Sequence, residues 1–176
     1  MSLSENKGIE LSVSSYGDVK GEQYHMAVLP WGATEPHNLH LPYLTDAILS
    51  RAVSVDAARL ALDMGARCMV LPAVTLGSQN PGQHTLPFCI HARYRTQYYM
   101  LHDTVSSLCG QEIRRLVIVN GHGGNNFKNM IRDLAVDFPG FLIATLEWYR
   151  LADAHKFFDE PGDHADELET SAMMHY

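Results

Sequence analysis

Four short apolar runs alternate along this chain with segments of helical periodicity, and this order constrains the fold more than any other feature. The runs that we expect to form strands cover residues 25–30, 67–71, 116–119 and 141–146. Helices are expected from an N-cap at Thr45 to Gly65, from about residue 93 to Gly110, over 127–136, and beginning again after 163. This β-α-β-α order predicts an α/β fold, a three-layer sandwich with a mostly parallel central sheet and helices on both faces.

The length and composition fit one globular domain. The 176 residues suffice for one well-packed α/β domain and are too few for two ordinary ones, so residues 1–176 are expected to form a single domain. Apolar residues make up 46% and charged residues 19%, and no stretch approaches the roughly 20 apolar residues of a membrane-spanning helix. We therefore expect no membrane association.

The net charge limits the kinds of partner that the chain can bind, and the cysteines indicate the cellular compartment. Thirteen basic and twenty acidic residues give a formal charge of −7, which would repel a phosphate backbone, so nucleic acid is not an expected partner. The three cysteines form no CxxC pair, and the N-terminus lacks the apolar core of a signal peptide. A reduced, cytoplasmic protein is the simplest interpretation.

Three polar clusters follow the predicted strands or the last loop. Glu35, His37 and Asp46 follow the first strand, the segment 120–125 (Asn-Gly-His-Gly-Gly-Asn) follows the third, and a cluster at 164–171 lies near the C-terminus. Since the carboxyl ends of parallel strands meet at one edge of a sheet, where such folds bind ligands, the clusters should converge. Carboxylate oxygen and imidazole nitrogen bind divalent metals, and a bridging carboxylate lets two ions share one pocket. Together with His122, the first cluster predicts a metal site.

Other interpretations of these clusters stay open. The segment 120–125 could be a Gly-rich turn or an anion cradle, although it lacks the Lys-Ser/Thr ending of a P-loop. Glu167 and Glu169 could simply favour a helix N-terminus through its dipole. His40 could orient a ligand from outside the ligand set. No serine or cysteine lies in a nucleophile elbow, which disfavours a serine or cysteine hydrolase.

Taken together, these residues resemble the motifs of the creatininase (creatinine amidohydrolase) family. That family has a pattern like S/T-E-x-H-G-x-H-L-P with a following Asp, then N-G-H-G-G-N, then H-A-G-E-x-E-T-S. Here the corresponding segments are 34–42, 120–125 and 164–171, in the same order, and the resemblance extends from about residue 25 to the end. It implies a creatininase-like fold. Relatives continue for some tens of residues past the place of Tyr176, so we expect this chain to lack their C-terminal tail.

The resemblance also implies roles for individual residues. The metal ligands would be Glu35, His37, Asp46 as the bridge, His122 and Glu169. They would bind two divalent ions, zinc in the first place, with manganese or iron as alternatives. His164 would be the catalytic acid–base residue. The residues expected to contact substrate are Ser78, His84, Gly123 and Trp148.

The implied activity is metal-dependent hydrolysis of a C–N bond other than a peptide bond. The substrate would be a small amide of the cyclic amide or formamide type, attacked by a metal-activated water. Relatives form hexamers, so the resemblance also implies a homo-oligomer. Three alternatives remain: a creatininase-like peptidase, a non-catalytic metal-binding or assembly protein of the same fold, and a sugar- or nucleotide-binding α/β domain.

Overall fold

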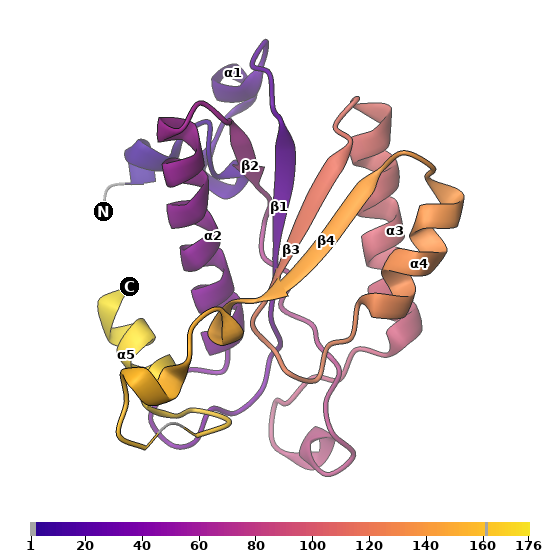
Figure 1. The fold of residues 1–176 in the computed structure, drawn as a ribbon. Coiled ribbons are helices and arrows are strands. Elements are labelled where there is room, and N and C mark those ends of the chain that lie inside the picture. Colours follow the sequence, from indigo (N-terminus) through magenta and orange to yellow (C-terminus); the bar gives the residue numbers. More distant parts are fainter. Residues whose placement is uncertain (1–2, 161) are drawn as a thin grey trace.

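A four-stranded sheet forms the centre of the computed structural model, which describes residues 3–160 and 162–176 (Figure 1). The strands are β1 (Met26–Trp31), β2 (Cys68–Val70), β3 (Arg115–Asn120) and β4 (Leu142–Glu147). Their order in the sheet is β2-β1-β3-β4, and all neighbours are parallel. The predicted α/β fold is confirmed, with a sheet that is parallel throughout.

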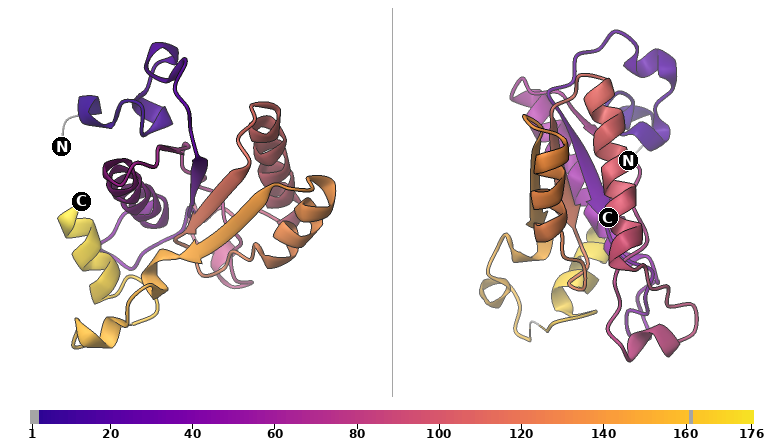
Figure 2. Two further views of the ribbon diagram at one scale, coloured as in Figure 1. Left: turned by 45° about the horizontal axis from the view of Figure 1, so that its top comes forward. Right: turned by 90° about the vertical axis from the view of Figure 1, so that its right-hand side faces the viewer.

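Helices cover both faces of this sheet. Helix α2 (Thr45–Asp63) lies on one face, and α3 (Tyr94–Gly110) and α4 (Lys128–Asp137) lie on the other (Figures 1 and 2). Helix α5 (Glu167–His175) contacts α2. The short helical segments are η1 (Leu3–Asn6), η2 (Leu11–Val13), α1 (Tyr16–Val19), η3 (Gln83–Thr85), η4 (Trp148–Arg150) and η5 (Ala154–Lys156). The three layers expected from the sequence are therefore present.

The core consists of two apolar clusters, one on each face of the sheet. Because side chains alternate along a strand, Leu29 and Ile118 pack with α3 and α4, whereas Val28 and Val119 pack with α2. Both faces are covered, which explains why β1 and β3 appear in the sequence as unbroken apolar runs. Each such side chain contributes about 1.5–3 kcal/mol by its burial. Strand β4 lies at the sheet edge and is largely exposed.

Some local predictions need correction. Thr45 does not cap α2: Leu44 occupies the N-cap position, and the Thr45 hydroxyl donates a hydrogen bond of 2.7 Å to the Pro42 carbonyl. The short helices before β1 were not predicted. Helix α1 nevertheless begins with a local signal, a capping box in which the Ser15 hydroxyl accepts from the Asp18 backbone N–H and the Asp18 carboxylate accepts from that of Ser15. In the described part of the chain, no helix has both the length and the apolar character needed to cross a membrane.

The carboxyl ends of the strands point to one edge of the sheet, at the bottom of Figure 1. The loop after β1, the loop from residue 71 to 93, and the turn after β3 all begin there. The beginning of α5 lies on the same side. This arrangement brings together the three polar clusters that lie far apart in the sequence.

Candidate metal centre

The five predicted ligands converge in one buried pocket at this edge of the sheet. Their exposed fractions are 2% for Glu35, 0% for His37, 2% for Asp46, 6% for His122 and 9% for Glu169. Donor atoms within 4.8 Å of one another form three groups: Glu35, Asp46 and His122; His37, Asp46 and Glu169; and Glu35, His37 and His164. Such mixed oxygen and nitrogen groups suit divalent metals.

Asp46 belongs to two of these groups, and its two oxygens face different imidazoles. Oδ1 lies 3.0 Å from Nε2 of His37, and Oδ2 lies 3.3 Å from Nδ1 of His122. Glu169 adds an oxygen 3.8 Å from the same His37 nitrogen, and Glu35 adds one 2.8 Å from the same His122 nitrogen. A carboxylate between two donor sets has the position that a bridging ligand of two ions requires.

Backbone carbonyls orient both buried imidazoles. Nδ1 of His37 lies 3.1 Å from the Glu35 carbonyl oxygen, and Nε2 of His122 lies 2.7 Å from that of Ser78. Because a carbonyl oxygen only accepts, the nitrogen facing it must carry the hydrogen. Loss of the proton on the opposite nitrogen then frees a lone pair that faces the carboxylates, which is how metal-binding histidines are usually held.

Glycines and asparagines of the segment 120–125 bring His122 close to α2 and to the loop after β2. A Cβ on Gly121 would lie 2.3 Å from Oγ of Ser50, and one on Gly124 would lie 2.1 Å from the Ser78 carbonyl oxygen, so no larger residue fits either place. The Asn120 side chain donates to the His122 carbonyl at 2.9 Å. Glycine at these two positions therefore permits the close approach of the turn to α2 and to the loop after β2.

The electrostatics of the pocket favour a cation. Burial opposes a charge on His122, but its hydrogen bonds to Asp46 and Glu35 outweigh this effect and raise its pKa to about 10. Burial likewise opposes ionisation of Asp46, yet hydrogen bonds from His122 and His37 lower its pKa. Oε2 of Glu35 is buried and has no hydrogen-bond partner among the residues described. Buried carboxylates with an unsatisfied oxygen fit a divalent ion, which would supply the missing positive charge.

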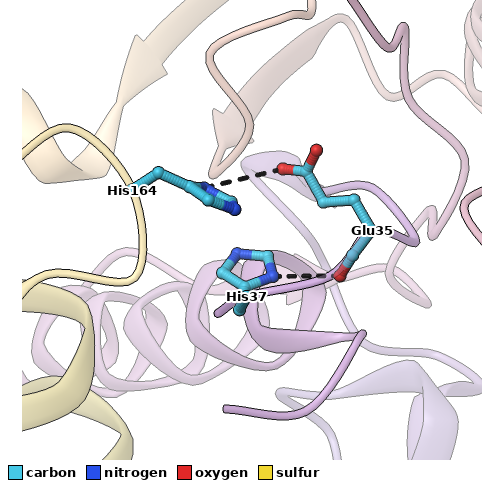
Figure 3. Close-up of side chains that lie close together, drawn as sticks. All are labelled: Glu35, His37 and His164. Carbon is cyan, nitrogen blue, oxygen red and sulfur yellow. Dashed lines mark hydrogen bonds and ion pairs between the residues drawn. The ribbon is translucent and has the colours of Figure 1, made fainter. Parts of the chain in front are cut away.

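His164 lies above the ring of His37 and faces Glu35 (Figure 3). The two ring centroids are 4.3 Å apart, and 37% of the His164 side chain is exposed. Nε2 lies 2.8 Å from the Pro36 carbonyl oxygen and must therefore carry a hydrogen, which leaves Nδ1 facing Oε1 of Glu35 at 3.9 Å. Ala165 has a φ of 50°, a left-handed conformation that is strained for alanine, next to this histidine.

The start of α5 brings Glu169 to the pocket. Asp166 caps the helix by accepting a 2.9 Å hydrogen bond from the Glu169 backbone N–H. Glu169 lies in the first turn, as the dipole interpretation requires, but it is buried and faces His37, whereas Glu167 is exposed. His40 lies outside the three donor groups and bonds Oγ1 of Thr170 at 2.9 Å, which ties the first motif to α5.

The four residues expected to contact substrate occupy different environments. The Ser78 hydroxyl is used inside the protein, since it donates to the Ala92 carbonyl at 3.2 Å and accepts from Gln97 at 2.7 Å. His84 is exposed on η3, and Gly123 is exposed beside His122. Trp148 is half-buried against the cluster on the α2 face. Their contact with substrate stays a prediction.

Two residues near the pocket were not singled out from the sequence. Oδ1 of Asn125 accepts from the Ser78 backbone N–H at 3.1 Å and so positions the carbonyl that holds His122. Its place in the 120–125 motif was a signal for this role. Tyr149 follows β4, and its hydroxyl lies beside Gly123. A tyrosine after an edge strand gives no comparable signal in a single sequence.

Comparison with known proteins agrees with this geometry. A putative creatinine amidohydrolase from Bacteroides fragilis NCTC 9343 is 58% identical, with a TM-score of 0.95 over 97% of this chain and 68% of that one. A creatinine amidohydrolase (creatininase) structure shares the fold, with a TM-score of 0.77 at 23% identity over 95% of this chain and 71% of that one.

A curated relative has a different described activity. The mycofactocin precursor peptide peptidase of Mycobacterium tuberculosis (strain CDC 1551 / Oshkosh) is 33% identical over 103 residues, which are 56% of this chain and 40% of the peptidase. The chain therefore matches less than half the length of this relative. The family model described as Creatininase, creatinine amidohydrolase, matches residues 10–176. With its motifs, strand order and donor pocket in agreement, the chain belongs to the creatininase family.

Proposed function

We propose that this chain, acting as a single domain, is a binuclear metal-dependent amidohydrolase that cleaves the C–N bond of a small cyclic amide or formamide. The observation that supports it most is the place of Asp46, whose two oxygens face His37 and His122 from between two donor groups. Membership of the creatininase family supports the same reaction class.

The two donor groups define the proposed ligands of each ion. Glu35, Asp46 and His122 would hold one ion, and His37, Asp46 and Glu169 would hold the other. Two divalent ions, when bound, supply a water of lowered pKa and polarise the amide carbonyl. We propose zinc in the first place and manganese or iron as alternatives, because similar creatininases include a structure described as the Mn form and one of Zn-Zn type.

The chain's own residues would carry the proton to the leaving group and shield the donor atoms from bulk water. The Pro36 carbonyl fixes the ring of His164 so that Nδ1 faces the pocket. An imidazole nitrogen can both take up and release a proton, so Nδ1 of His164 would deliver one to the departing nitrogen of the amide. Burial of the Glu35, His37 and Asp46 side chains keeps bulk water from the donor atoms. No side-chain nucleophile is needed in this scheme.

A creatininase-like peptidase is the second candidate. The mycofactocin precursor peptide peptidase is 33% identical to this chain over the matched 103 residues, and an amide bond is common to both substrate classes. A small-molecule substrate is favoured because a creatininase of the same fold has been solved in complex with creatine.

We also propose a homo-oligomer, which light scattering of the purified protein would test.

A metal-restoration screen separates these functions. The protein would be purified without chelator, analysed for its metals, stripped, and reloaded with zinc, manganese or iron(II). Each form would be assayed with lactams, formamides and short peptides. Metal-dependent hydrolysis of a lactam or formamide would support the amidohydrolase, and cleavage of peptides alone would replace it with the peptidase. Bound metal without any turnover would favour the non-catalytic alternative.

A further inference from the structure

The hydroxyl of Tyr149 is buried and is not used by the chemistry proposed so far. Tyr149 lies in η4, directly after β4. Its oxygen is inaccessible to solvent, and none of the residues in the described part of the chain hydrogen-bonds it. A buried donor without a partner is destabilising, because it has given up its hydrogen bond to water. Such a group is tolerated most readily where a ligand supplies the partner.

This hydroxyl lies beside the candidate metal centre. A Cβ built on Gly123 would be 3.6 Å from it, and Gly123 directly follows the predicted ligand His122. Burial is the main reason that the pKa of Tyr149 is raised to about 12, and the negative charges of Glu147 and Asp46 add to the effect. The hydroxyl therefore keeps its proton near neutral pH and is available as a hydrogen-bond donor.

The ring is held in place although its hydroxyl is not. The Trp148 ring packs against it edge-on with centroids 6.2 Å apart, and the Arg150 guanidinium carbon lies 5.7 Å from its centroid. By contrast, the half-buried Tyr24 and Tyr43 donate to the backbone carbonyls of Gly8 and Pro87, at 3.1 and 2.8 Å. Tyr149 thus differs from these two tyrosines in that its hydroxyl has no hydrogen-bond partner in the described part of the chain.

We propose that Tyr149 is a substrate-contacting residue, whose hydroxyl donates a hydrogen bond to an acceptor atom of the small amide bound beside Gly123. This inference rests on the proposed function, because it places the amide next to His122. Because Gly123 has no side chain, no atom occupies the point 3.6 Å from the hydroxyl where a Cβ would lie. When substrate binds, the hydroxyl would form the hydrogen bond that it lacks in the protein alone.

The test compares Tyr149→Phe with the matched control Tyr24→Phe. Both variants lose only a hydroxyl. Tyr24 donates to the Gly8 carbonyl and lies just before β1, at the amino end of that strand, whereas the candidate metal centre lies at the carboxyl ends. The measurements are the melting temperature of the metal-free protein, the zinc content after loading, and the Kd of acetohydroxamic acid, a small amide-like metal chelator. Gly123→Val serves as a second variant, since its side chain would fill the space in front of the hydroxyl.

We expect Tyr149→Phe to melt at or above the wild-type temperature and to keep its zinc, while its Kd for acetohydroxamic acid rises about 3- to 10-fold. Gly123→Val should weaken the same probe, and Tyr24→Phe should melt lower with an unchanged Kd. An unchanged Kd in Tyr149→Phe, or a melting temperature lowered as much as in Tyr24→Phe, would overturn the inference. A wild-type protein that takes up no metal would instead refute the proposed function, and the inference with it.

Discussion

Two buried acidic clusters contact the same helix, α2, and their partners differ in kind. Glu10 is 1% exposed, as buried as Glu35 and Asp46. Its two oxygens accept hydrogen bonds from Nε and Nη2 of Arg51, at 2.6 and 2.8 Å, and the side chains of Ser12 and Asn6 donate to it as well. The Glu10 cluster is therefore complete, since a fixed cation and neutral donors satisfy the carboxylate.

At the other cluster, the partners of the carboxylates are imidazoles. Glu35, Asp46 and Glu169 face His37 and His122, and no ion pair joins any of these carboxylates to a lysine or arginine in the described part of the chain. One Glu35 oxygen stays without a hydrogen bond. The comparison teaches that burial of a carboxylate does not indicate a metal site. Carboxylates that face imidazoles and not a lysine or arginine, with one carboxylate oxygen left without a hydrogen bond, do indicate one.

The largest expected effect is the loss of activity in Asp46→Asn. An amide in place of the bridging carboxylate removes the negative charge shared by both donor groups, so hydrolysis of the lactam or formamide identified by the screen should fall to background. Asp63→Asn, an exposed position on the same helix, is the matched control and should leave the rate unchanged. Undiminished hydrolysis by Asp46→Asn would refute the bridging role.

The next effect concerns His164, which lies beside the donors on a separate segment. His164→Gln should keep full metal content while the rate falls by about 10²–10⁴-fold, the usual contribution of a general acid–base group. The loss should shrink for amides with better leaving groups. His155→Gln, at an exposed place in η5, provides the control. If His164 only braces the start of α5, the variant would melt lower and keep its rate per metal-loaded molecule.

Much of the fold was predictable, because the sequence patterns that indicate strands and helices are local. The apolar runs marked all four strands within a few residues, and the loops after them supplied the ligand candidates. The pairing of Glu10 with Arg51 was not predictable, because it joins residues 41 positions apart and neither belongs to a motif. The Tyr149 hydroxyl was missed for a related reason: its burial depends on how η4 packs, which no periodicity reveals.

A smaller effect, on stability alone, is expected at the complete cluster. Glu10→Gln removes the ion pair but leaves Arg51, whose side chain is 40% exposed, partly solvated. The free energy of unfolding should therefore drop by only about 1–3 kcal/mol, measured by urea denaturation, with metal content unchanged. A loss of metal in this variant would mean that the two clusters are coupled through α2. The Glu10 cluster could then not be treated as independent of the metal centre.

The smallest effect is a pH dependence set by His122. In the metal-free protein its pKa is about 10. Because the folded pKa is raised above the unfolded value of about 6.5, the stabilisation is complete below that value and is lost as pH rises through about 10. Metal must displace this proton, so zinc affinity should rise about tenfold per pH unit between about pH 7 and 8.5. An affinity that levels off above pH 7 would contradict the raised pKa.

The measurement that tests the central claim most directly is a calorimetric titration of the metal-free protein with zinc, checked by elemental analysis of the dialysed product. If Asp46 bridges two donor groups, the wild-type chain should bind two equivalents and Asp46→Asn at most one with comparable affinity. A wild-type chain that binds one equivalent or none, or an Asp46→Asn variant that binds two as tightly as the wild type, would contradict the binuclear site.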